Sequence, residues 1–93
     1  MITAFVLIGA APEAIADLAP ALADIDGVRE AHSVAGGDTD LIAVVRVPTH
    51  QDIATVVTER IAKLPGVTST GTMIAFRSYS DADLDAVYEG FGD

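Results

Sequence analysis

The pattern of apolar and polar positions predicts four strands and two helices, in the order strand, helix, strand, strand, helix, strand. In the strands, large apolar and β-branched residues alternate between two faces, whereas in the helices they recur at helical spacing. A glycine-bearing turn between the second and third strands predicts a β-hairpin. The strands are expected at 2–9, 28–35, 40–47 and 67–76, and the helices between Pro12 and Gly27 and between Thr49 and Pro65.

Local signals mark the ends of the helices. Pro12 suits a first helical turn, where its missing N–H does no harm, and Gly27 is placed to end the first helix. Pro20 lies inside the same helical pattern and is expected to kink or split it. Thr49, with Asp52 three residues later, resembles a capping box at the start of the second helix. A further short helix is expected in the C-terminal tail, at 80–91, with Leu84, Val87, Tyr88 and Phe91 on one side.

Two stretches of the chain echo each other. LADIDGV at 22–28 and IAKLPGV at 61–67 both end a helix with glycine and open a strand with valine, about 39 residues apart. Two such units in this order make the split βαβ arrangement of ferredoxin-like folds. We therefore expect an α+β fold, a βαββαβ sandwich in which both helices cover one face of an antiparallel sheet. At 93 residues the chain is expected to be one domain, with a core at 1–77 and a helical tail at 80–91.

Both faces of the first and third strands are apolar, although a sheet that helices cover on one side needs only one apolar face. The chain is 51% hydrophobic, with a mean hydropathy of +0.43. A domain of this size does not easily bury that much apolar surface by itself. We therefore expect a second copy to cover the outer face, sheet against sheet. The residues expected in this dimer interface are Phe5, Leu7, Ile42, Val44 and Arg46.

Composition excludes several classes of function. A net charge of −9 would repel the phosphates of nucleic acid, so no direct nucleic-acid partner is expected. The chain has no cysteine, which excludes disulfides and thiol chemistry, and no apolar run long enough to cross a membrane. Because the N-terminal run does not look like a secretory signal, we expect a cytoplasmic protein.

No catalytic motif stands out. His32 and His50 are expected on different elements, with neither a nucleophile pattern nor metal-ligand spacing beside them. The chain also lacks the phosphate-binding loop, nucleophile elbow and zinc-protease motifs. We therefore expect no enzyme, no metal and no cofactor. Arg46 and Arg77 are two of the five bases of this acidic chain, and they fit either an interface ion pair or an anion site.

Two groups of polar residues are candidates for ligand binding. In the hairpin turn at 37–40, either the carboxylates bind local backbone, or they take the ammonium group of a small molecule while glycine N–H groups take a carboxylate. Thr70 and Thr72 lie two apart on the last strand and therefore share a face. Their hydroxyls fit a polar ligand, but threonine is also a common strand residue.

The turn AGGDTDL at 35–41 and the later LPGVTSTGT at 64–72 together resemble the ligand-binding domain of the Lrp/AsnC regulators, in the same order of elements up to Phe76. The chain departs from the family pattern at Gly36 and Thr39. The resemblance implies a stand-alone member without the family's helix-turn-helix. It also implies dimers through the sheets, further association to tetramers or octamers, and an amino-acid effector bound between dimers near the turn. The ligand-binding residues that it implies are Gly37, Asp38, Thr39, Asp40, Thr70 and Thr72.

These observations favour an oligomeric, effector-binding module with no DNA-binding domain of its own, which modulates transcription by co-assembling with full-length Lrp/AsnC regulators. Two other hypotheses stay open. A small dimeric monooxygenase would share the ferredoxin-like architecture and place His, Asn, Trp or Tyr in a pocket between sheet and helices, but this chain has no Trp. An ACT-like regulatory domain would bind its ligand at strand–helix ends and not at the hairpin.

Overall fold

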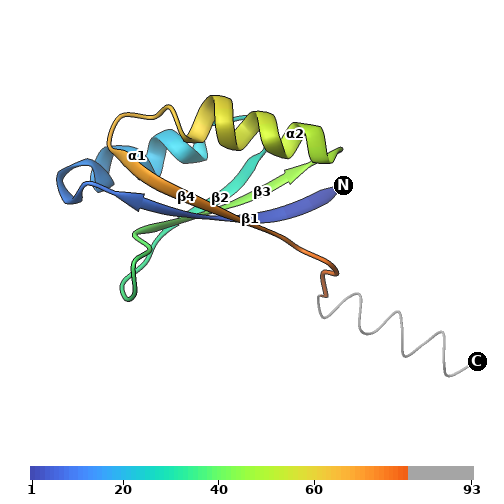
Figure 1. Ribbon diagram of the computed structural model, residues 1–93, viewed down its shortest axis with the longest axis horizontal. Helices are drawn as coiled ribbons and strands as arrows, with labels where there is room; N and C mark the ends of the chain where they lie inside the picture. The colour runs from blue at the N-terminus through green and yellow to red at the C-terminus, as the bar shows by residue number, and fades with distance from the viewer. Residues whose placement is uncertain (80–93) are drawn as a thin grey trace, which may run out of the picture.

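The computed structural model describes residues 1–79, in which helices cover one face of an antiparallel sheet (Figure 1). The predicted α+β, ferredoxin-like βαββαβ fold is therefore confirmed, whereas the helix expected at 80–91 lies outside the described residues. The strands lie in the order β2-β3-β1-β4. In chain order the elements are β1 (Ile2–Ala10), η1 (Pro12–Ala14), α1 (Ile15–Ala23), β2 (Val28–Ser33), β3 (Leu41–Val47), α2 (His50–Thr55), η2 (Val56–Ile61) and β4 (Val67–Ile74).

The register of the ladder sorts the strand residues into two faces. Ile8 of β1 lies opposite Leu41 of β3 and Thr70 of β4, and Phe5 lies opposite Val44 and Met73. Because directly paired residues share a face, the first row faces the helices and the second faces away from them. In β1 as far as Ile8, and throughout β3, the buried residues all lie on the helix side of the sheet. They are Ala4, Val6, Ile8, Leu41, Ala43, Val45 and Val47.

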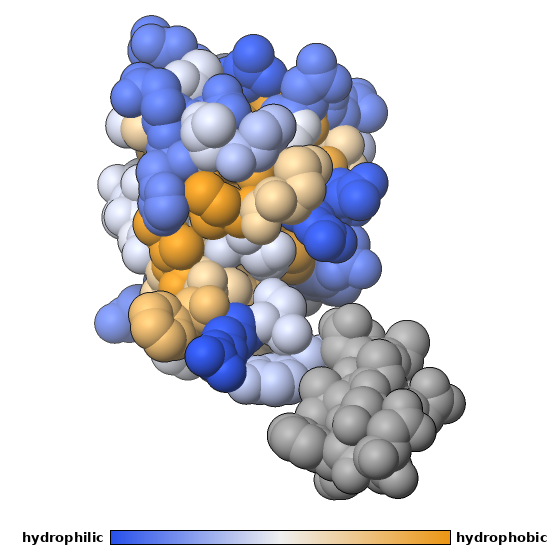
Figure 2. All heavy atoms as spheres, turned by 90° about the vertical axis from the view of Figure 1, so that its right-hand side faces the viewer, coloured by the Kyte–Doolittle hydropathy of each residue, from blue (hydrophilic) through white to orange (hydrophobic). Residues whose placement is uncertain are grey.

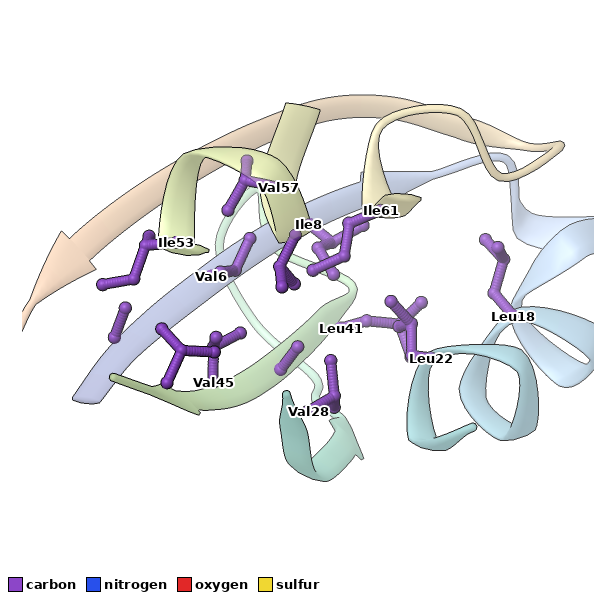
Figure 3. Packing of buried hydrophobic residues seen from close by; sticks show 14 of the residues in the cluster. Val6, Ile8, Leu18, Leu22, Val28, Leu41, Val45, Ile53, Val57 and Ile61 are labelled. Carbon is purple, nitrogen blue, oxygen red and sulfur yellow. The ribbon is translucent and has the colours of Figure 1, made fainter. Parts of the chain in front are cut away.

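The core lies between this inner face and the helices (Figure 3). Leu18 and Leu22 are the buried residues of α1, and they recur at the spacing that the sequence pattern predicted. Figure 3 shows that the side chains from α1, α2, η2 and the sheet form one continuous cluster. The second helical segment contributes Ile53, Val56, Val57 and Ile61.

The two repeated units have matching backbone geometry. Gly27 and Gly66, which lie in the turns directly before β2 and β4, both have a φ of +95°. The helical segments themselves end earlier than predicted, at Ala23 and Ile61. In each unit the valine that opens the next strand donates its N–H to a carbonyl three residues earlier, at 3.0 Å in the first unit and 3.2 Å in the second. A side chain at Gly66 would also collide with α1, because a Cβ built there lies 2.3 Å from the Cβ of Ala14. Glycine at this position therefore serves both the backbone conformation and the packing.

The helices differ from expectation in two places. Of the two outcomes expected at Pro20, a kink or a split, the split does not occur, because α1 runs through this residue to Ala23. The predicted capping box is present: the Asp52 N–H donates to Thr49 Oγ1 at 3.1 Å, and the Thr49 N–H donates to Asp52 Oδ2 at 3.2 Å. Beyond α2, however, the winding becomes π-helical over η2, a change that the sequence pattern did not predict. None of the helices in the described part of the chain is long and apolar enough to cross a membrane.

Candidate functional site

The hairpin turn between β2 and β3 is the first part of the predicted ligand site. Figure 1 shows the turn extending from the sheet on the side away from the helices. Gly36 and Gly37 have φ values of +116° and +64°, and a Cβ built on either residue would meet nothing within 4 Å. The turn therefore needs glycine for its backbone conformation and not for lack of space. Asp38 is exposed together with these glycines, whereas Thr39 and Asp40 are half-buried.

Asp40 joins the turn to the end of β1. Its carboxylate Oδ2 accepts a hydrogen bond from the Ala10 N–H at 2.9 Å, and its own N–H donates to the Ile8 carbonyl at 2.9 Å. The pairing of β1 with β4 shifts its register between Gly9 and Ala10, and the carboxylate satisfies a backbone donor at this shift. The carboxylate thus binds backbone, as one hypothesis for the turn proposed. The partner is not local, however, because it lies 30 residues away in the sequence.

The two threonines lie across β1 from the hairpin. Thr70 pairs with Ile8, and Thr72 pairs with Val6, so they share the face on which the helices lie. Both side chains are nevertheless exposed, because β4 is an edge strand of the sheet. Leu41, the residue after Asp40, occupies the same row as Thr70, two strand spacings or about 9.6 Å away. The hairpin and Thr70 therefore flank the same end of β1.

Three residues that the sequence analysis did not select lie between these groups. Gly9 pairs with Ser69, and a Cβ built on Gly9 would lie 2.4 Å from Ser69 Oγ and 3.1 Å from Thr68 Oγ1. The two hydroxyls can approach β1 this closely only because residue 9 has no side chain. A glycine inside an apolar strand is a known sign of such close approach, so Gly9 was the available signal.

The five residues predicted for a dimer interface lie on the outer face of the sheet. Phe5 is 38% exposed, whereas Leu7, Ile42 and Val44 are half-buried, and Arg46 is exposed at the margin. Met73 of β4, which the sequence analysis did not include, lies beside Phe5 and is 57% exposed. We call this surface the open face, and its apolar residues are Phe5, Leu7, Ile42, Val44 and Met73.

The polarity of the surface follows this layered arrangement. Figure 2, a view from the end where β1 begins, shows a mostly hydrophilic helix layer and hydrophobic side chains at the surface below it. The two histidines do not meet. His32 lies 3.4 Å from Glu30 on exposed β2, and His50 begins α2. Within residues 1–79, no three His, Cys, Asp or Glu residues are grouped so that they could hold a metal ion.

Comparison with known proteins places this geometry in a family. A model of the family described as the Lrp/AsnC ligand binding domain matches residues 3–84. The uncharacterized HTH-type transcriptional regulator PF0250 of Pyrococcus furiosus is 36% identical over 77 residues, which cover 80% of this chain and 51% of that protein. The chain thus spans about half the length of the curated relatives that it matches.

Solved structures show the same similarity. The structure of TTHA0845 from Thermus thermophilus is 42% identical and has a TM-score of 0.80, covering 86% of this chain and 99% of that chain. A feast or famine regulatory protein from M. tuberculosis, complexed with L-methionine, is 29% identical and has a TM-score of 0.72. That alignment covers 87% of this chain and 54% of the mycobacterial chain.

Proposed function

The chain belongs to the Lrp/AsnC ligand-binding domain family, and from this premise we propose that it is an oligomeric module that binds an amino-acid effector and is not an enzyme. The names of its curated relatives, which are transcriptional regulators, support a regulatory role. The L-methionine complex of the mycobacterial relative supports an amino acid as the class of effector.

The proposed site lies at the end of the sheet that carries the hairpin. An amino acid presents an ammonium group and a carboxylate, so it needs a negative partner and several N–H or O–H donors. Asp38 and the second oxygen of Asp40 supply the negative partner, and the N–H of Gly37 with the hydroxyls of Thr39, Thr70 and Thr72 supplies the donors. Because the turn extends away from the helices and the two strand threonines lie on the helix face, the proposal takes the turn and these threonines from different copies. The observation that carries the proposal is the hydrogen bond from Ala10 to Asp40, because it fixes a carboxylate of the turn at the end of β1, between β3 and β4.

A second copy is needed to enclose this site. Asp38, Gly37 and both threonines are exposed on the single chain, and small-molecule sites bury most of their ligand. We propose that copies pair through the open face, with Arg46 at the margin of that interface, and that such dimers associate further into tetramers or octamers. The effector would then lie between dimers, near the hairpin turns.

Regulation would follow from linkage between binding and assembly. A ligand held by groups from two dimers favours the assembly that contains its site, by as much as its affinity differs between the two states. We further propose that the module co-assembles with full-length regulators of the same family and so modulates them. In this proposal the chain is a single domain, with a core at 1–77 and a helical tail at 80–91.

The test is a thermal-shift screen of the twenty amino acids on the full chain, followed by calorimetry. An effector at 100 times its Kd should stabilise the folded state by about 2.7 kcal/mol. Asp38→Asn should weaken its binding by about tenfold or more, because a hydrogen bond to a charged group contributes roughly 1.5–3 kcal/mol. Asp24→Asn makes the same change at an exposed residue after α1 and is the matched control. Absence of any shift, or equal binding by the Asp38→Asn variant, would contradict the proposal.

A further inference from the structure

A basic hollow lies at the end of the sheet opposite the hairpin, where β1 begins and β3 and β4 end. It has a volume of about 720 Å³, and Arg46, His50 and Arg77 line it together with the N-terminal residue Met1. No acidic side chain of the described residues lines it. The remaining lining is mainly apolar and consists of Ile2, Ile74, Ala75 and Phe76, with Thr3 and Ser78. We call this hollow the basic groove.

The positive charge extends beyond the basic groove. A second hollow of about 400 Å³ shares Thr3, Arg46 and Ser78 with it and adds Arg29 and Tyr79, although Glu30 also lines this part. Three of the five Lys and Arg residues of a chain with fourteen acids therefore gather at this end of the sheet. Within residues 1–79, the one contact of a basic side chain with an acid within 4 Å is that of His32 with Glu30, so no salt bridge of the described residues joins the arginines of the groove to an acid.

The chain leaves its own body beside the basic groove. After β4, the Ala75 N–H still donates to the Thr3 carbonyl at 2.8 Å, and Figure 1 shows the chain beyond this bond leaving the end of the sheet. Phe76 is 98% exposed and Tyr79 is 66% exposed, so neither aromatic ring packs substantially on the described part of its own chain. Aromatic side chains gain most of their stabilisation from burial, so this segment presents two rings that a second surface can cover.

The segment that follows, residues 80–93, is rich in acidic residues, and the lining of the groove has none among the described residues. Residues 80–93, SDADLDAVYEGFGD, contain five of the fourteen acids of the chain and no base. The same residues include the apolar side chains Leu84, Val87, Tyr88 and Phe91, which suit the apolar part of the groove lining. Charge and polarity therefore match between the groove and this segment.

We propose that residues 80–93 of one copy dock in the basic groove of a second copy. We assign the occupant to a second copy because the two rings that lead to it, those of Phe76 and Tyr79, are left exposed by their own body. The groove is also continuous with the open face, since Thr3 and Arg46 form the row of the ladder next to the row of Phe5 and Val44 along that face. Two-fold pairing across the open face would make the exchange reciprocal. The proposal rests on the proposed function only for the existence of a dimer.

The test uses disulfide trapping in the full chain, which has no cysteine of its own. One copy carries Thr3→Cys in the groove, and another carries Ala82→Cys or Ala86→Cys in the C-terminal segment. Mild oxidation of the mixture should produce the disulfide-linked heterodimer, and adding Arg77→Glu to the groove copy should slow it about threefold or more. We expect an effect of this size because an exposed ion pair changes a binding equilibrium by a factor of up to about five. The Arg77→Glu change also replaces attraction of the acidic segment by repulsion. Lys63→Glu makes the same charge change outside the groove and should leave the rate unchanged.

A reciprocal exchange of charge makes the test specific. Asp81→Arg and Asp83→Arg in the C-terminal segment should restore trapping by the Arg77→Glu groove. The proposal is overturned if the mixture gives no heterodimer while the unmodified chain sediments as a dimer, or if trapping occurs only within a chain that carries both cysteines. An unmodified chain that sediments as a monomer would instead remove the proposed assembly itself, so the two failures can be told apart.

Discussion

Substitution of Phe5 tests the open face as an interface between copies. Phe5 lies on this face between Val44 of β3 and Met73 of β4, and it is 38% exposed. Its neighbours along β1, Ala4 and Val6, point into the core and are fully buried. Replacing Phe5 therefore changes the outer surface without opening the core, and the single chain should stay folded.

The size of the effect follows from the exposed area. A phenylalanine presents on the order of 200 Å² when fully exposed, so 38% leaves about 75 Å² for a partner to cover. At about 25 cal/mol per Å², this area contributes about 2 kcal/mol per copy, and a two-fold interface contains it twice. Because alanine retains part of the contact, Phe5→Ala should weaken the dimer by about 2–4 kcal/mol, or roughly 30- to 700-fold in Kd. Phe5→Lys should weaken it further, since it places a charge in the interface.

Sedimentation equilibrium over a range of concentrations measures this shift directly, because the monomer is only 9.6 kDa. Ala16→Lys adds the same charge at an exposed position of α1, away from the open face, and should sediment like the unmodified chain. Circular dichroism should show that the Phe5 variants keep their secondary structure. If Phe5→Lys assembles as the unmodified chain does, the open face is not the interface and the reasoning from its exposed apolar residues fails.

Two further predictions concern stability and are checked by denaturation at one fixed protein concentration. Gly66→Ala should cost about 2 kcal/mol or more, because φ is +95° there and the new Cβ would lie 2.3 Å from that of Ala14. Gly71→Ala is its control, because a Cβ built there meets nothing within 4 Å, and a destabilisation beyond about 0.5 kcal/mol would count against the argument. Thr49→Ala should cost about 1 kcal/mol, since it removes the acceptor of the Asp52 N–H, and an unchanged midpoint would show that the capping box contributes nothing.

The elements of the fold were predictable because their signals are local. Alternation located the strands to within one or two residues, whereas the helical segments end at Ala23 and Ile61, before the glycines at 27 and 66 that were expected to end them. The π-helical winding of η2 was not predictable, since its apolar positions also suit an ordinary α-helix. It shows only in the backbone, where the Ala62 N–H donates to the carbonyl of Val57, five residues earlier.

The candidate site was only partly predictable, because some of its contacts join segments that are far apart in the sequence. The glycine-bearing turn and the two threonines of the last strand could be recognised, because each pattern consists of residues that are close together in the sequence. The bond from Ala10 to Asp40 joins segments 30 residues apart, so it exists only once β1 and β3 lie side by side. Ser69 came to notice only through its contact with Gly9, which depends on the pairing of β1 with β4. Contacts between strands that are distant in sequence leave no mark in a local pattern.

The position of β1 explains how binding at the turn and assembly through the sheet can be linked. β1 pairs with both β3 and β4 and carries Phe5 and Leu7 on the open face. Its last residues hold Asp40 through both the backbone and the side chain. A ligand that binds the other oxygen of the Asp40 carboxylate therefore contacts a group held by the same strand that supplies the interface. Because linkage requires a difference in affinity between free and assembled copies, the bond between Asp40 and Ala10 is the contact through which we expect that difference to arise.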